Sequence, residues 1–185
     1  FGRVRHQKGT DLFVDAMIEL LPSRPGWSAI VAGRATAQHA AFEQELKTRV
    51  AAAGLSERIM FVGEHSDIAR WYKALSLFVA PQRWEGFGLT PLEAMATGVP
   101  VVAADVGAFS ELIEQGVTGT VIARDDLAAM AAAAGRMMDE DEARQAAGAA
   151  GLRRVQAQFA LEREAEAIGR VYEQVWRAAG KYRPT

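Results

Sequence analysis

Hydrophobic residues follow two alternating patterns along this chain. Short runs that are apolar at nearly every position alternate with longer segments whose apolar residues recur every three or four positions. The first pattern predicts buried strands, and the second predicts amphipathic helices. The predicted strands cover residues 27–32, 59–62, 75–80, 99–104 and 120–122. The predicted helices cover residues 10–21, 38–53, 67–73, 90–96 and 107–115, followed by three segments from 125 onward that break near 139 and 159.

This alternation predicts an α/β fold, with a Rossmann-like parallel sheet flanked by helices on both faces. Strands that are apolar throughout must be covered on both sides, which is the situation of a parallel sheet between two helical layers. Ligands of such sheets bind at the carboxyl ends of the strands. Gly33, Gly63, Glu85 and Asp105 each follow a predicted strand, so we expect all four on that edge.

Length and composition limit the classes of protein to which this chain can belong. With 185 residues, half of them hydrophobic, the chain has enough material for one domain with an ordinary core. The first residues, Phe1-Gly2-Arg3, include no initiator methionine, and we expect a piece of a longer protein. A net charge of −2 without a Lys/Arg run argues against nucleic-acid binding. The absence of cysteine excludes disulfides and thiolate metal sites, and no apolar stretch approaches the roughly 20 residues needed to span a bilayer.

The segment from Glu85 to Glu93 carries the strongest chemical signal. Its two carboxylates stand eight positions apart, on either side of a Gly86-Phe87-Gly88 loop between a predicted strand and a predicted helix. Such a loop directs backbone N–H groups and the positive end of the helix dipole at one point, where phosphate binds well. Carboxylates beside a phosphate site accept hydrogen bonds from sugar hydroxyls. The combination predicts a nucleotide-sugar ligand.

A purely structural reading of the same residues stays open on local grounds. Thr90-Pro91-Leu92-Glu93 has the form of a capping box, in which Glu93 would reach back to the backbone N–H of Thr90. Glu85 would then be a solvated loop acid, and the glycines would serve only a tight turn.

The opening loop, residues 2–9, favours the ligand reading. It holds three cations and two glycines. Arginine offers a planar fork that matches phosphate oxygens, and lysine offers a mobile point charge, so Arg3 and Lys8 together can neutralise a diphosphate. If Phe1 closes a first strand, this loop lies on the same edge of the sheet as Glu85. The alternative is a solvated loop with a basic bias.

Other kinds of site are poorly supported. The chain has no G-x-G-x-x-G opening a strand-helix unit and no Walker-type lysine motif. The acidic pair at 125–126 and the acidic triplet at 139–141 lie where helices are predicted to start, so we interpret them as caps and as partners of the helix dipole. His6, His39 and His65 have no metal-ligand spacing, and no metal site is predicted.

Taken together, these motifs resemble the donor-binding, C-terminal half of family-4 retaining glycosyltransferases, which have the two-domain GT-B architecture. The segments that carry the resemblance are Gly2-Arg3 with Lys8-Gly9, Phe61-Val62-Gly63, Glu85-Gly86-Phe87-Gly88 with Glu93, and Gly98-Val99-Pro100-Val101-Val102-Ala103 with Gly107. Residues 8–16 are more loosely similar to bacterial mannosyltransferases of the lipopolysaccharide core. The resemblance implies that residues 1–185 form a nucleotide-sugar-binding domain whose N-terminal acceptor domain is absent.

The resemblance also implies roles for individual residues. It gives catalytic roles to Arg3, Lys8 and Glu85. It gives substrate-binding roles to Gly2, Gly63, Glu64, Gly86, Phe87, Gly88, Leu89, Thr90 and Glu93. The two cations would bind the donor diphosphate, Glu85 would lie against the transferred hexose, Glu93 would accept from the ribose hydroxyls, and the base would rest by the turn at 63–65.

Partners follow from the same resemblance. The substrates would be a donor such as GDP-mannose or a UDP-sugar and a carbohydrate or glycolipid acceptor, with no metal, no cofactor and retention of configuration. The enzyme would be cytoplasmic, with at most peripheral contact with the inner membrane. The domain alone would bind nucleotide and transfer nothing, and the apolar stripe of its last helix (residues 161–178) would be partly exposed. A sugar-nucleotide epimerase of related architecture and a non-catalytic nucleotide-sugar-binding module are the alternatives.

Overall fold

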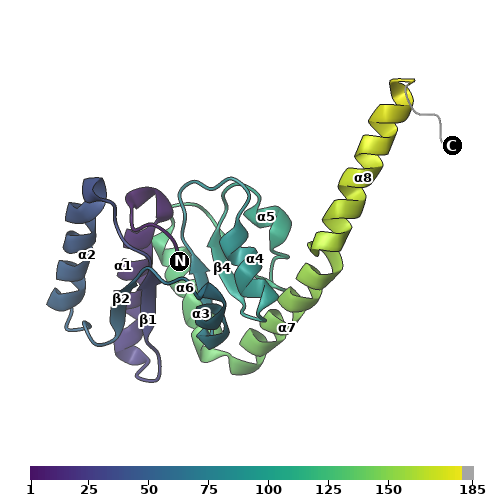
Figure 1. Ribbon diagram of the computed structural model, residues 1–185. Helices are drawn as coiled ribbons and strands as arrows, with labels where there is room; N and C mark the ends of the chain where they lie inside the picture. Colours follow the sequence, from purple (N-terminus) through teal and green to yellow (C-terminus); the bar gives the residue numbers. More distant parts are fainter. Residues whose placement is uncertain (181–185) are drawn as a thin grey trace.

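The structure is a computed structural model that describes residues 1–180 and has an α/β fold (Figure 1). The strands are β1 (Ala29–Ala32), β2 (Ile59–Gly63), β3 (Phe78–Ala80), β4 (Val101–Ala104) and β5 (Gly119–Ile122). The helices are α1 (Thr10–Leu20), α2 (Ala40–Ala52), α3 (Ile68–Ala74), α4 (Leu89–Ala96), α5 (Phe109–Leu112), α6 (Leu127–Asp139), α7 (Asp141–Gln158) and α8 (Leu161–Ala178). Short 3-10 turns cover His6–Lys8, Leu21–Ser23 and Ala37–His39. The order of strands and helices predicted from hydrophobic periodicity is confirmed.

All strand pairs are parallel, but the strands form two hydrogen-bonded groups rather than one sheet. β1 pairs only with β2, and the second group has the order β3-β4-β5. The register places Ala29 beside Ile59 in the first group and Phe78 beside Val101 in the second. The expected single sheet is therefore divided between β1 and β3, because no strand among the described residues lies between them.

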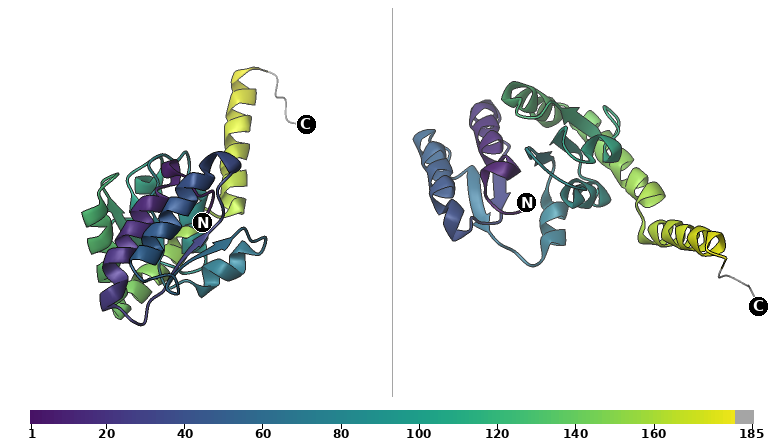
Figure 2. Two further views of the ribbon diagram at one scale, coloured as in Figure 1. Left: turned by 90° about the vertical axis from the view of Figure 1, so that its left-hand side faces the viewer. Right: turned by 90° about the horizontal axis from the view of Figure 1, so that it is seen from above.

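Helices cover the strands from two sides, as the right-hand view of Figure 2 shows. On one side α1, α2 and α6 bury Met17, Leu46 and Met130 in a core that also contains Val102 of β4. On the other side α3, α4 and α5 build a second core that contains Val101 of β4. Successive residues of a strand point to opposite faces, so β4 is buried at every position. This double burial explains why the strand sequences are continuously apolar.

The first residues follow the path expected for the end of a strand. The backbone N–H of Gly2 donates to the carbonyl of Ala32 at 2.9 Å, and the N–H of Val4 donates to the carbonyl of Arg34 at 3.1 Å. From the first of these hydrogen bonds to the second, the residue numbers of donor and acceptor both increase by two. This segment therefore runs parallel to the chain that leaves β1. The ring of Phe1 stacks on Tyr72 with 4.6 Å between ring centroids. The opening loop is thereby fixed at the carboxyl ends of the strands.

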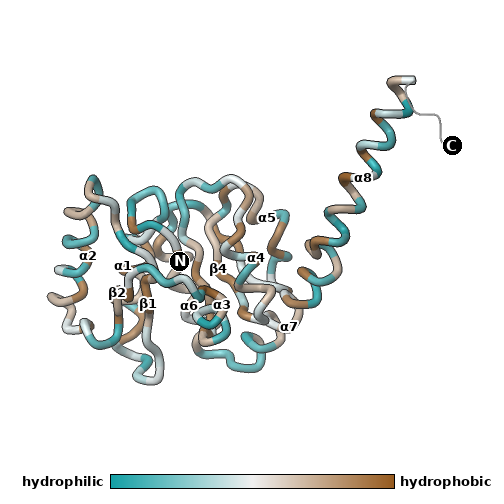
Figure 3. The backbone as a smooth tube through the Cα atoms, in the orientation of Figure 1, coloured by the Kyte–Doolittle hydropathy of each residue, from teal (hydrophilic) through white to brown (hydrophobic). Residues whose placement is uncertain are grey.

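Helix α8 extends away from the rest of the molecule (Figure 1). Hydrophobic residues recur along it in Figure 3, and the side chains of Ile168, Val171, Tyr172 and Val175 are exposed. The expected exposure of its apolar stripe is confirmed. Within the described part of the chain, no helix is both long enough and apolar enough to cross a membrane.

Candidate functional site

Two loops meet at the carboxyl ends of the strands: the opening loop (residues 2–9) and the loop after β3 (residues 81–88). The backbone N–H of Arg83 donates to the carbonyl of Gln7 at 3.0 Å. Gly9 has a φ of +66°, and a Cβ there would lie 1.8 Å from the carbonyl oxygen of Pro81. Only glycine permits this contact. The sequence places a glycine where the two loops must touch.

Lys8 and Glu85 form the centre of the site. The Lys8 Nζ lies 2.6 Å from Glu85 Oε2, and the side chains are 24% and 19% exposed. Burial would raise the pKa of Glu85, but hydrogen bonds from Lys8 and from the Gly86 backbone N–H, together with the charge of Arg5, hold that pKa below its ordinary value. Glu85 is therefore a carboxylate at neutral pH. Residues separated by 77 positions in the sequence converge here, as the opening-loop prediction requires.

The loop after β3 is held from its other side by the loop after β4. Gly107 has a φ of +55°, and a Cβ at this residue would lie 2.5 Å from the carbonyl oxygen of Glu85 and 2.4 Å from that of Gly86. The backbone N–H of Ala108 donates to the Gly86 carbonyl at 3.3 Å. Trp84, Phe87 and Leu89 are more than half exposed. The backbone of the loop is thus fixed, while the loop and the first residue of α4 present large apolar side chains to solvent.

Glu93 does not belong to a capping box, so that interpretation is wrong. Helix α4 begins at Leu89 with Gly88 as its N-cap, and no side chain caps it. Gly88 has a φ of +104°, and a Cβ there would lie 2.4 Å from the Phe109 ring. This close contact with α5 makes helix α4 start earlier in the sequence than the capping box predicts. Thr90 therefore lies inside the first turn, where its hydroxyl accepts a hydrogen bond of 3.5 Å from the Gln82 side chain.

The carboxylate of Glu93 instead accepts a hydrogen bond from the Tyr72 hydroxyl at 2.8 Å through Oε2. Burial of the tyrosine, and beside it the hydrogen bond and charge of Glu93, raises the pKa of Tyr72 far above its ordinary value. The Tyr72 hydroxyl therefore keeps its proton at neutral pH and acts as the donor in this hydrogen bond. Glu93 is exposed, and this bond fixes the position of its carboxylate at the surface of α4.

Arg3 and the turn after β2 lie at the other end of the site. Arg3 is exposed, and among the described residues no hydrogen bond or ion pair holds its guanidinium. It lines a cavity of about 360 Å³ together with Arg34 and Glu64, whose side chains form a 3.5 Å ion pair. The backbone N–H of Gly33 donates to the carbonyl of Gly63 at 2.6 Å and joins the two strand ends. Arg3 also lines a larger cavity with Lys8, so both predicted cations reach one edge of the sheet.

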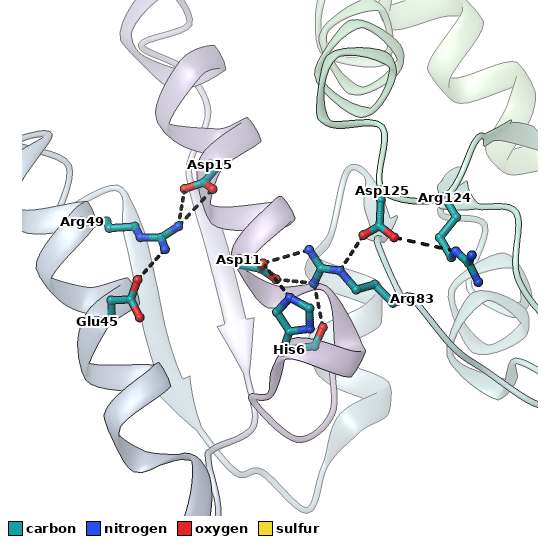
Figure 4. A network of polar contacts seen from close by, with 8 residues as sticks. All are labelled: His6, Asp11, Asp15, Glu45, Arg49, Arg83, Arg124 and Asp125. Atoms are coloured by element: carbon teal, nitrogen blue, oxygen red, sulfur yellow. Dashed lines mark hydrogen bonds and ion pairs between the residues drawn. The ribbon is translucent and has the colours of Figure 1, made fainter.

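Arg83 is the residue that sequence reasoning missed. Its guanidinium binds both carboxylate oxygens of Asp11 at 2.7 and 2.9 Å, Oδ1 of Asp125 at 2.5 Å and the carbonyl of His6 at 2.7 Å (Figure 4). Burial would raise the pKa of Asp11, but the hydrogen bond and charge of Arg83 hold it below its ordinary value. One side chain therefore ties the opening loop, α1 and the loop after β5 to the loop that carries Glu85.

The acidic clusters have mixed roles. Asp126 caps α6 by accepting from the Ala129 N–H at 2.8 Å, as predicted. Asp125 instead pairs with Arg83, and Asp139 ends α6 and pairs with Arg24 at 2.6 Å, so a capping role for these two is wrong. Both are held by arginines from distant segments, which no local pattern reveals. No group of three His, Cys, Asp or Glu residues within residues 1–180 is placed to hold a metal ion.

Two buried polar atoms lie in the same two loops. Within the described chain, Nε of Arg5 and Oε1 of Gln82 have no hydrogen-bond partner. Buried polar atoms are normally satisfied by protein, water or a ligand. The edge of the sheet thus combines unsatisfied polar atoms, cations from the opening loop and carboxylates from the loop after β3.

Comparison with known proteins identifies the family. The family described as glycosyl transferases group 1 matches residues 1–140. The chain belongs to this family. Among curated relatives, the lipopolysaccharide core biosynthesis mannosyltransferase LpsB of Rhizobium meliloti (strain 1021) is 68% identical over 96% of the chain. LpcC of Rhizobium leguminosarum bv. viciae, with the same description, is 59% identical over 93% of the chain. The chain spans 51% and 49% of these two relatives, so it corresponds to about half of each.

Solved structures support the group 1 fold. The C-terminal domain of a glycosyl transferase group 1 family protein (LpcC) from Francisella tularensis superposes with a TM-score of 0.84 at 34% identity. The match covers 87% of this chain and 84% of that domain. HepE from Anabaena in complex with UDP superposes with a TM-score of 0.87 at 24% identity, over 94% of this chain and 48% of HepE, which shows the fold alone. The predicted fold class and family are confirmed.

Proposed function

We propose that this group 1 domain binds a nucleotide-diphospho-sugar and, within a longer enzyme, supplies the donor half of a hexosyl transfer that retains anomeric configuration. The observation that supports the proposal most is the 2.6 Å contact between Lys8 and Glu85. It brings a phosphate-type cation and a sugar-type carboxylate from two loops to one point at the carboxyl ends of the strands, where parallel sheets bind their ligands.

Each site residue has a chemical role in this proposal. Arg3 and Lys8 stabilise the charge that develops on the leaving diphosphate. The backbone N–H groups of Phe87, Gly88 and Leu89 meet the donor phosphate and sugar at the start of α4. Glu85 holds the hexose and the positive charge that develops at its anomeric carbon. The acceptor attacks from the same face as the departing phosphate, which preserves the configuration.

The nucleoside occupies the neighbouring positions. Glu93 accepts hydrogen bonds from the ribose hydroxyls with its carboxylate oriented by Tyr72. Gly2 and the turn at Gly63-Glu64 border the base. Arg3 is exposed and unpaired within residues 1–180, so it can bind a phosphate without first giving up an ion pair. Lys8 can contact the diphosphate and Glu85 together.

The names of the two rhizobial relatives suggest the substrates. Both are described as lipopolysaccharide core biosynthesis mannosyltransferases. We therefore propose GDP-mannose as donor and a lipopolysaccharide-core glycolipid as acceptor, the latter bound by a second domain. An enzyme of this kind works in the cytoplasm, at the inner face of the inner membrane. Residues 1–185 by themselves are expected to bind the donor and to transfer nothing.

A thermal-shift panel on this domain tests the proposal. GDP-mannose at a hundred times its Kd should add about 2.7 kcal/mol to the free energy of unfolding, which raises the Tm of a domain of this size by roughly 5–10 °C. UDP-glucose and UDP-N-acetylglucosamine serve as comparisons. A shift with a UDP-sugar alone would keep the donor-binding role and overturn the mannosyl assignment, and no shift with any of them would overturn both. An isomer formed by the longer enzyme from donor alone would favour an epimerase.

The Glu93→Gln substitution tests the ribose contact. Glutamine keeps an acceptor for Tyr72, so the free energy of unfolding should change by less than about 1 kcal/mol. A carboxylate hydrogen bond to ribose is roughly twice as strong as a neutral one, so the Kd for GDP should rise about tenfold by calorimetric titration. Tyr72→Phe is the matched control, because it removes the protein hydrogen bond to Glu93 and leaves the carboxylate. If Glu93→Gln leaves the Kd for GDP unchanged, or changes it less than Tyr72→Phe does, Glu93 does not bind the ribose.

A further inference from the structure

The smaller cavity beside Arg3 contains a cation and a carboxylate that have no role in the diphosphate site. This cavity has a volume of about 360 Å³ and is lined by Arg3, Arg34, residues 35–37 and Glu64. Arg34 comes two residues after β1, and Glu64 comes directly after β2, so both stand at the carboxyl ends of the first strand group. We call the side chains of Arg34 and Glu64 the charged pair.

Hydrogen bonds fix the backbone that carries the charged pair. The carbonyl of Arg34 accepts from a backbone N–H of the opening loop at 3.1 Å, and the following N–H donates to the carboxylate of Glu43 at 2.8 Å. Glu64 follows Gly63, whose carbonyl accepts from the Gly33 N–H at 2.6 Å. The two strand ends are thereby tied to each other, to the opening loop and to α2. Such a support places side chains well enough to recognise a ligand.

The charged pair keeps atoms that are able to bind a ligand. Nε of Arg34 lies 3.5 Å from Oε2 of Glu64, and the two side chains are 70% and 62% exposed. An exposed ion pair of this kind contributes little to stability, so it can rearrange around a ligand at low cost. The cavity therefore presents a fork of N–H donors beside a carboxylate that only accepts.

A guanine base matches this arrangement of donors and acceptors. One edge of guanine carries an acceptor, O6, followed by two neighbouring donors, N1–H and the N2 amino group. The carboxylate of Glu64 has two oxygens, so it can accept from both donors together. The guanidinium of Arg34 can donate to O6 and N7, which is the usual contact of arginine with guanine.

The other common bases fit the charged pair less well. Uracil has a single N–H between two carbonyl oxygens, so a carboxylate that accepts from this N–H meets the negative end of a carbonyl beside it. Adenine has its amino donor and its ring acceptor in the reverse order along the ring, and it offers Glu64 one group in place of two. The pair therefore favours guanine both by attraction and by repulsion of its competitors.

The cavity also lies where the base of a bound nucleoside diphosphate can reach it. Arg3 lines both this cavity and the larger one that includes Lys8. Glu93, the proposed ribose contact, is held by Tyr72, whose ring stacks on Phe1 two positions before Arg3. With its phosphates at Lys8 and Arg3, the nucleotide can therefore place its base beside the charged pair.

We propose that Arg34 and Glu64 select a guanine nucleotide: Arg34 donates to O6 and N7, and Glu64 accepts from N1–H and the N2 amino group. This inference rests on the proposed donor-binding function and deepens it, because it assigns the choice of base to two side chains. The argument depends on the chemistry of the cavity and not on the names of the relatives.

Calorimetric titration of the domain with GDP, inosine diphosphate (IDP) and UDP tests the proposal. IDP differs from GDP only in lacking the N2 amino group, and UDP keeps the ribose and diphosphate but changes the base. The Kd for GDP should be about tenfold or more below that for UDP and about fivefold below that for IDP. Glu64→Gln should raise the Kd for GDP about tenfold and reduce the difference between GDP and IDP to about twofold or less. Its Kd for UDP should stay the same or fall.

Glu45→Gln is the matched control for Glu64→Gln. The carboxylate of Glu45 also forms an exposed ion pair, 2.5 Å from Arg49, and its side chain is 57% exposed. All three dissociation constants should be unchanged in this variant. Arg34→Ala separates the base from the phosphates, because it should raise the Kd for GDP about tenfold and that for UDP by less than about threefold.

The outcomes distinguish the choice of base from donor binding itself. If the wild-type domain binds UDP as tightly as GDP, or if Glu64→Gln leaves the ratio of GDP to IDP affinity unchanged, the assignment of Glu64 is overturned while donor binding stands. Equal losses of GDP and UDP binding in Arg34→Ala would assign Arg34 to the phosphates and overturn its role at the base. Failure of the wild-type domain to bind any of the three nucleotides would overturn donor binding and this inference together.

Discussion

Replacing Lys8 with alanine in the longer enzyme that contains this domain lowers kcat by about a hundredfold or more. This is the scale measured when one preorganised donor that stabilises developing negative charge is removed. Lys8 is only 24% exposed and is held 2.6 Å from Glu85, so it is already positioned before a diphosphate arrives. In the variant the leaving phosphates keep Arg3 but lose the second cation. Steady-state kinetics with saturating donor and acceptor measures the effect.

Lys47→Ala is the matched control for this measurement. Its ammonium also lies 2.6 Å from a carboxylate, that of Glu43 one helical turn away, but the pair sits on the surface of α2. Surface pairs of this kind contribute roughly 0–1 kcal/mol, and none of our roles involves Lys47. Its kcat should be unchanged. A Lys8→Ala enzyme that turns over as fast as the Lys47→Ala enzyme would remove Lys8 from the mechanism.

Replacing Arg83 with alanine destabilises the domain by about 2–3 kcal/mol and weakens nucleotide binding. The guanidinium is 17% exposed and makes charge-assisted hydrogen bonds to two aspartates, and such bonds contribute roughly 1.5–3 kcal/mol each when a partner is left behind. Arg83→Lys should not restore stability, because an ammonium cannot bind both oxygens of Asp11 while it reaches Asp125. Denaturant unfolding and calorimetric titration of the same variants separate the two effects.

Arg49→Ala provides the comparison for Arg83. Arg49 also bridges two carboxylates, those of Asp15 and Glu45, and Figure 4 shows this group beside the contacts of Arg83. It is 40% exposed and links only α1 to α2, so its loss should cost less than about 1 kcal/mol and leave nucleotide binding intact. Equal losses in both variants would show that Arg83 does not position the site.

The pH dependence of stability gives Arg83 a distinct signature. Because Arg83 holds the pKa of Asp11 below its ordinary value of 3.8, the stability from this pair is complete above that value. It is lost as pH falls through the lowered pKa. In Arg83→Ala the pKa of Asp11 returns toward its ordinary value or rises above it through burial. The acid-sensitive part of the unfolding free energy should therefore be smaller in that variant.

Much of the fold could be predicted because it depends on local patterns. Continuous apolar runs mark strands that are buried on both faces, and β4, buried at every position, is the clearest case. The contact between Lys8 and Glu85 could also be predicted, since both residues follow the carboxyl ends of strands in a parallel fold. Fold topology alone brings such residues together, whatever their separation in the sequence.

The errors came from contacts between segments that are distant in the sequence. The pattern at 90–93 has the form of a capping box, but the fit of Gly88 against Phe109 starts α4 earlier and turns Glu93 toward Tyr72. Arg83 binds Asp11 and Asp125, which lie 72 and 42 positions away in the sequence. A local sequence pattern therefore cannot reveal its role. The division of the sheet between β1 and β3 was not predicted either, because hydrophobic periodicity marks each strand separately and does not show which strands pair.

The central claim is that the opening loop and the loop after β3 form one binding site for a nucleoside diphosphate. The most direct test is an NMR titration of the 20.0 kDa domain with GDP, following assigned backbone amides. We expect the amides of residues 2–9 and of residues 85–89 to shift together and to give one common Kd. Shifts in only one of these loops, separate dissociation constants for the two, or shifts confined to other parts of the domain would contradict the claim.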